Sequence, residues 1–190
     1  MRVETGTVQI LRILDAPGLD PIRVTFDDIE PGKGRITIEC WGKAWASYWG
    51  GMGDRTISQF FQHCTAQYLI GNLDSSLQSD RYSADALMAL ARKVIISRRR
   101  GADVDFDSLD KDDARELFDQ VDEIQDCHTS RECWHQSKLL TEIFGQEWYL
   151  YCDGRAMEPN PDYEYLSLII EAVQQGIGIM QKESQPCLER

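Results

Sequence analysis

The sequence is short of basic residues. Its 190 residues include 20 Lys and Arg against 32 Asp and Glu, which gives a formal net charge of −12. Affinity for nucleic-acid phosphates and for anionic lipid comes mainly from excess positive charge. The composition therefore argues against direct nucleic-acid binding and against docking on a membrane.

Long apolar runs are also missing. No run approaches the ~20 residues that a membrane helix needs, and the opening MRVETGTVQI has neither the basic leader nor the apolar core of a signal peptide. Six cysteines are scattered through apparent helices and strands instead of following a disulfide framework. We expect a cytoplasmic protein with reduced, mostly buried thiols.

Strand patterns occupy the first fifty residues. Apolar and polar residues alternate over 8–13, 22–27 and 36–40, and a Pro-Gly turn at 30–34 separates the last two runs. This pattern predicts a small N-terminal antiparallel sheet of about three strands.

Helix patterns follow Gly53, with apolar residues three and four apart. They predict about five helices: from Thr56 or Ser58 to Leu69, from Ser83 to Val94, from Ser108 or Asp110 to Ile124, over about 130–144, and from Pro161 onward. Strands followed by helices indicate an α+β fold with the helices packed on the sheet.

The length fits a single domain over residues 1–190. Within it we expect a strand-rich part at 1–50, a helical part at 54–182 and a loose tail at 183–190. Gly176 and Gly178 are expected to weaken the last turns of the tail helix.

Three tryptophans recur every four residues, at Trp41, Trp45 and Trp49. This spacing aligns them on one side of a helix and equally on one face of a strand. Large rings laid across the core are the favoured interpretation. The alternative is a partner-binding ledge formed by Trp45 and Trp49, because tryptophan is enriched in interface hot spots.

Cysteine and histidine gather in one short segment, at Cys127, His128, Cys133 and His135. Structural zinc sites use two ligand pairs separated by a longer loop, which this compact cluster lacks. A zinc site or a small metal-dependent enzyme here is the alternative hypothesis, and structural residues are the default. We identify no catalytic motif and expect no cofactor.

Acidic residues are concentrated between positions 103 and 126, where eleven carboxylates face only Lys111 and Arg115. Asp112, Glu116, Asp119 and Glu123 are spaced to lie on one side of a helix. This side is either a solvated face, balanced in part by Arg92, Lys93 and the arginines at 98–100, or a docking surface for a basic protein.

Two stretches, ITIECWGKAWASYWGGMGDRTI (36–57) and PNPDYEYL (159–166), resemble accessory proteins of temperate phages and prophages. No activity is attached to that group, so no functional residue is carried over. The resemblance implies a bacterial host cytosol and a role in binding host proteins.

Together these features favour a non-enzymatic acidic protein. We expect it to inhibit a host defence or nucleic-acid-binding protein through a DNA-mimicking surface. The expected partner is a host protein with a basic surface, and a homodimer joined through an apolar helix face is a further hypothesis.

Overall fold

The computed structural model describes residues 1–102 and 106–183. The chain forms two compact units: residues 1–78 with the chain from Pro161 onward, and Ser79–Asn160, which is inserted between them in the sequence. The fold is α+β, as the sequence predicts. The expected loose tail, together with Asp103, Asp105 and Cys187, falls outside the described residues apart from Glu183.

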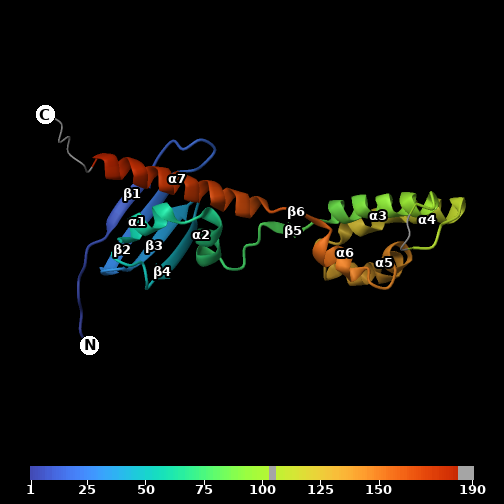
Figure 1. Ribbon diagram of the computed structural model, residues 1–190, viewed down its shortest axis with the longest axis horizontal. Helices are drawn as coiled ribbons and strands as arrows, with labels where there is room; N and C mark the ends of the chain where they lie inside the picture. Colours follow the sequence, from blue (N-terminus) through green and yellow to red (C-terminus); the bar gives the residue numbers. More distant parts are fainter. Residues whose placement is uncertain (103–105, 184–190) are drawn as a thin grey trace. The chain divides into compact units, whose positions relative to one another are not determined.

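The first unit is built on a four-stranded antiparallel sheet, one strand more than predicted (Figure 1). Its strands lie side by side in chain order: β1 (Gln9–Ile13), β2 (Ile22–Glu30), β3 (Lys33–Cys40) and β4 (Lys43–Trp49). Pairs such as Val24 opposite Ile38 alternate with half-buried or exposed residues, so one face is buried.

The extra strand, β4, contains two of the regularly spaced tryptophans. A two-residue turn, Trp41-Gly42, joins it to β3, and both residues have positive φ angles of 49° and 71°. Positive φ at both central positions is the geometry of the hairpin turns that match strand twist. Trp41 is therefore an exposed turn residue, and only Trp45 and Trp49 lie in the strand.

Three helices cover the buried face of this sheet (Figure 1): α1 (Ile57–His63), α2 (Ala66–Leu73) and α7 (Pro161–Glu183). The predicted tail helix is confirmed, and it buries the apolar stripe Leu166, Ile169, Ile170, Val173 and Ile177. It continues to Glu183 in spite of its two glycines. A Cβ at Gly176 would lie 3.0 Å from Ile13 Cδ1, so this glycine allows β1 to approach the helix closely.

The single helix predicted from residue 56 to Leu69 is wrong, because the chain forms α1 and α2 there. Cys64 is extended, with a ψ angle of 152°, and Thr65 caps the second helix by accepting a hydrogen bond from Tyr68 N at 3.3 Å. Apolar residues keep a helical spacing across this break, so the sequence pattern does not reveal where α1 ends.

The second unit is mainly helical and has its own hydrophobic core. The predicted helix headed by Ser83 is α3 (Ala84–Arg99), and the next is α4 (Lys111–Gln120). The 3₁₀ helices η1 (Val121–Asp126) and η2 (Glu132–Gln136) precede α5 (Ser137–Phe144) and α6 (Tyr149–Gly154). The helix predicted over 130–144 thus begins as a 3₁₀ helix and ends, as expected, at Gly145.

A short two-stranded sheet closes the second unit at its chain ends. β5 (Asp80–Tyr82) pairs antiparallel with β6 (Met157–Pro159), and Asn160 N donates to Ser79 O at 2.9 Å. These strands and α6 were not predicted from the sequence. The chain therefore enters and leaves this unit at neighbouring positions.

Candidate functional site: an acidic surface on α4

The acidic helix begins at Asp110, one of the two predicted caps. The Asp110 carboxylate accepts hydrogen bonds from Asp112 N at 2.8 Å and Asp113 N at 2.9 Å. Ala114 and Leu117 are buried against the core of the second unit. Because a helix repeats every 3.6 residues, burial of these two positions turns Asp112, Glu116 and Asp119 outward.

The four predicted docking carboxylates are all exposed, but they do not share one helix. Asp112, Glu116 and Asp119 lie on α4, whereas Glu123 lies in η1 after α4 has ended at Gln120. The expected continuous row is therefore wrong at its last member. Val121 and Ile124 are buried, as the apolar pattern required, although they belong to the tighter 3₁₀ helix.

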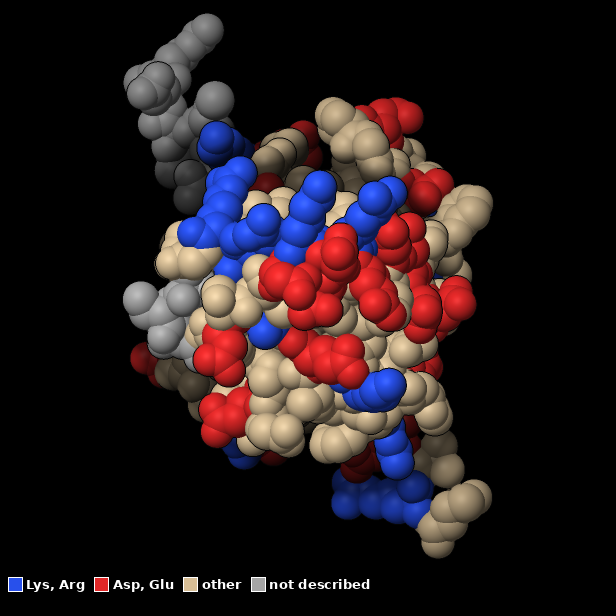
Figure 2. All heavy atoms as spheres, turned by 90° about the vertical axis from the view of Figure 1, so that its right-hand side faces the viewer, with Lys and Arg blue, Asp and Glu red and all other residues tan. Residues whose placement is uncertain are grey.

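Few of these charges are neutralised inside the molecule. Within residues 106–126, the only carboxylate that forms an ion pair with a described residue is Asp122, whose partner is Arg92. Figure 2 shows Asp and Glu side chains gathered in a broad patch that borders a band of Lys and Arg. We use "acidic surface" below for Asp112, Asp113, Glu116, Asp119 and Glu123.

Of the basic residues expected to balance this run, Arg92 pairs with Asp122, whereas the arginines at 98–100 have other roles or other positions. The Arg98 guanidinium donates to the main-chain oxygens of Asp107, at 3.0 Å, and of Glu142 and Ile143. It also lies 5.6 Å from the centre of the Phe106 ring. Arg99 and Arg100 are exposed and form no ion pair with any described residue. The arginines at 98–100 therefore form no ion pair with the described carboxylates of the acidic surface.

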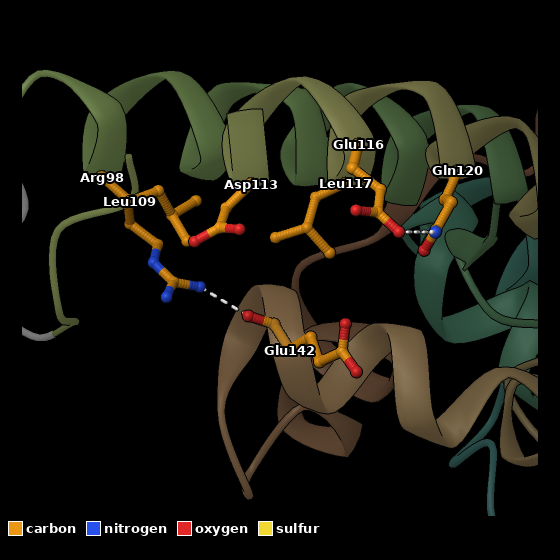
Figure 3. A pocket seen from close by; sticks show the side chains of 7 residues that line it. All are labelled: Arg98, Leu109, Asp113, Glu116, Leu117, Gln120 and Glu142. Atoms are coloured by element: carbon orange, nitrogen blue, oxygen red, sulfur yellow. Dashed lines mark hydrogen bonds between the residues drawn. The ribbon is translucent and has the colours of Figure 1, made fainter. Parts of the chain in front are cut away.

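A hollow of about 310 Å³ lies between α4 and α5 at the edge of the acidic surface (Figure 3). Asp113 and Glu116 reach it from α4, Glu142 from α5, and Leu117 lines its floor. Arg98 also lines it, and its guanidinium is hydrogen-bonded to main-chain oxygens of Glu142 and Ile143. Gln120 Nε2 donates to Glu116 Oε1 at 3.3 Å and holds that carboxylate in place. Three carboxylates around an apolar floor suit a Lys or Arg side chain, whose stem is apolar and whose head is cationic.

Sequence reasoning missed Glu142, and no local signal could have found it. It lies in the last turn of α5, and only the packing of α5 against α4 brings it to the hollow. Asp113 belongs to the acidic run, but it was not on the helix side chosen from the spacing. Its proximity to Glu142 is likewise a tertiary feature.

The two tryptophans proposed as a ledge belong to the first unit, not to the unit that carries the acidic surface. Trp49 is buried, donates through Nε1 to the Tyr68 hydroxyl at 3.0 Å and packs 5.7 Å from the Phe60 ring. Trp45 is half-buried against the same core. These contacts favour the core interpretation over the partner-binding one.

The cysteine and histidine cluster is divided by the fold. Cys127 and Cys133 are buried, whereas His128 and His135 are exposed. Nowhere in residues 1–102 and 106–183 do three or more His, Cys, Asp or Glu side chains form a group that could hold a metal ion. The four-ligand metal site is thus not assembled in this part of the chain.

The two buried thiols instead meet Cys152 and Tyr82. The Tyr82 hydroxyl lies 3.1 Å from Cys133 Sγ. Hydrogen bonds from Cys152 and Tyr82 lower the pKa of Cys133 to about 6 because they stabilise its thiolate, although burial acts in the opposite direction. Burial raises the pKa of Cys127 to about 11. As expected, the described cysteines are free thiols, and four of the five are buried.

None of the described helices is long and apolar enough to cross a membrane. Comparison with known sequences gives one family match: the model of Phage_phiTE_072, a phage family, aligns with residues 1–178. No curated protein and no solved structure matches the chain.

Proposed function

Because this chain belongs to the phage family Phage_phiTE_072, we propose that it is a non-enzymatic accessory protein that binds and inhibits a basic host protein. The acidic surface would make the contact. The observation that carries this proposal is the exposure of Asp112, Glu116 and Asp119 on α4, without an ion pair to any described residue.

The arrangement of these carboxylates suits a protein that normally binds nucleic acid. Along an α-helix, residues three or four apart are separated axially by about 4.5–6 Å, and phosphates on one DNA strand follow one another about every 3.4 Å along the axis. The carboxylates are more widely spaced than the phosphates, but a row of them can still occupy basic residues that would otherwise contact phosphates. It would also accelerate association with a basic partner through long-range attraction.

The hollow between α4 and α5 would add specificity to this charge attraction. A Lys or Arg of the partner could place its head group among Asp113, Glu116 and Glu142 and its stem against Leu117. Hydrogen bonds between charged groups are roughly twice as strong as neutral ones. Contacts in the hollow therefore favour a defined partner over any cationic surface.

The proposal is tested by charge removal without change of shape. We expect immobilised wild-type chain to retain a basic protein from host lysate, and the fourfold variant D112N, E116Q, D119N and E123Q to retain at least tenfold less of it. A matched control neutralises four exposed carboxylates elsewhere, D54N, E147Q, D153N and E171Q. This control should keep the partner.

Two further readouts separate this proposal from nonspecific charge. Partner binding should weaken steeply with salt, because screening removes attraction between exposed charges. A short DNA duplex should compete with the chain for the captured protein. Equal retention by the two fourfold variants, both confirmed as folded by circular dichroism, would rule out docking through the acidic surface.

A further inference from the structure

A second groove lies on another side of α4, where this helix packs beside α3. Its volume is about 260 Å³. Four cations line it, Arg99 and Arg100 from the end of α3 and Lys111 and Arg115 from the start of α4. Asp119 is the one carboxylate in its lining among the described residues. In a chain with a net charge of −12, this is a local reversal of sign.

The floor of the groove is apolar and partly open to water. Ile96 is 41% exposed and Phe118 is 38% exposed, and both lie in the groove. The core of the second unit is filled by their buried neighbours, including Ile95 and Leu117. Adjacent exposed apolar side chains with a polar rim are typical of a protein-binding surface.

Ion pairs among the described residues do not account for the four cations. None of them forms an ion pair with a residue in the described ranges, although carboxylates are abundant nearby. Arg99 lies in the last turn of α3, where the helix dipole favours positive charge. Lys111, however, is the first residue of α4, where the dipole disfavours a cation. Its position is therefore unfavourable for the helix and available for a ligand.

We propose that this groove binds an acidic peptide segment of a partner protein, with a large apolar side chain of that segment seated on Ile96 and Phe118. Asp and Glu residues on either side of the anchor would pair with Arg99, Arg100, Lys111 and Arg115. The groove borders the acidic surface at Asp119, which lines both, but its four cations and its apolar floor are separate from that surface.

Charge and chemistry argue against two other occupants, a symmetrically docked second copy and nucleic acid. A second copy of the chain docked symmetrically would place these four cations against their own equivalents, since such an interface brings the same patch of both copies together. Nucleic acid, whose exposed groups here are phosphates, would leave the apolar floor of Ile96 and Phe118 unused. An acidic segment with an apolar anchor satisfies both the rim and the floor.

Selection from a random twelve-residue peptide library on the full-length chain tests this proposal. We expect the selected peptides to carry a Leu, Phe or Trp flanked by Asp or Glu. In fluorescence anisotropy, replacing the anchor by Ser or the acidic residues by their amides should each weaken binding at least tenfold. Selection of peptides without this pattern would overturn the proposal.

Variants of the chain then locate the binding site. R99Q, R100Q, K111Q and R115Q together should reduce affinity for the best peptide at least tenfold, and so should F118S alone. The matched control R35Q, R131Q, K138Q and K182Q should bind as the wild type does. I96S provides a second test of the floor if F118S does not fold. Undiminished binding by the folded groove variants, or displacement of the peptide by a DNA duplex, would refute the assignment.

Discussion

At the scale of single residues, Gly32 shows how closely the turn of one hairpin approaches a neighbouring loop. Its φ angle is +73°, and a Cβ there would lie 2.1 Å from Gly53 O. We predict that Gly32→Ala lowers the free energy of unfolding by more than about 3 kcal/mol, because the strain of positive φ adds to a clash with backbone. Urea denaturation followed by circular dichroism measures this loss.

Gly18 is the matched control for this prediction. It has the same φ of +73°, but nothing lies within 4 Å of the position of its Cβ. Gly18→Ala should therefore lose only about 1–2 kcal/mol, which is the conformational cost alone. Equal losses in the two variants would show that the clash with Gly53 O adds nothing to the cost of a side chain at position 32.

Single residues also show where sequence reasoning stops. The burial of Trp49 and the free thiols of Cys127 and Cys133 follow from their residue types, and the structure agrees. The meeting of Cys152 with Cys133, and of Glu142 with the acidic surface, depends on helices that are distant in sequence. Residue type predicts burial, but it does not predict which partner lies opposite.

At the scale of elements, Asp110 holds the start of α4 and with it the acidic surface. We predict that Asp110→Ala lowers the free energy of unfolding by about 1 kcal/mol, because the amide groups of Asp112 and Asp113 lose their acceptor. Asp110→Asn should cost only a few tenths of this, since an amide oxygen can also cap a helix. Thermal unfolding of the three proteins measures the difference.

Asp107 provides the comparison for general loss of charge. Its side chain is exposed and belongs to the same acidic run. Asp107→Ala should leave stability unchanged within about 0.5 kcal/mol, as is usual for surface substitutions. If it destabilises the protein as much as Asp110→Ala does, charge in this run, rather than capping, controls stability.

Elements with local signals were predictable, and elements without them were not. Ser83 and Asp110 cap their helices as expected, Gly145 ends α5, and the alternation in β2 and β3 gives a hairpin. The three-residue strands β5 and β6 are too short to show a period, and their pairing joins residues 80 and 159. Apolar residues keep a helical spacing across the change from α4 to η1. No sequence signal therefore marks the end of α4 at Gln120, and the predicted row of carboxylates extends too far, to Glu123.

At the scale of the whole molecule, we propose that the inserted unit folds by itself. Residues 79–160 contain a hydrophobic core of their own, and β5 and β6 hold the two chain ends together. A unit whose two chain ends lie close together is easily inserted into another unit, because little chain must be ordered to connect the two units. The fragment should show helical circular dichroism and one cooperative thermal transition.

A shorter fragment, 84–155, tests why the excised unit is stable. It lacks β5, β6 and the buried residues Ser83 and Ala156, whose backbones are joined by a hydrogen bond of 2.9 Å. We expect it to unfold at a lower temperature than 79–160. Since the acidic surface lies wholly within 79–160, the longer fragment should also capture the same basic partner as the full chain. A fragment 79–160 that is unfolded in isolation would show that this core requires the remainder of the chain.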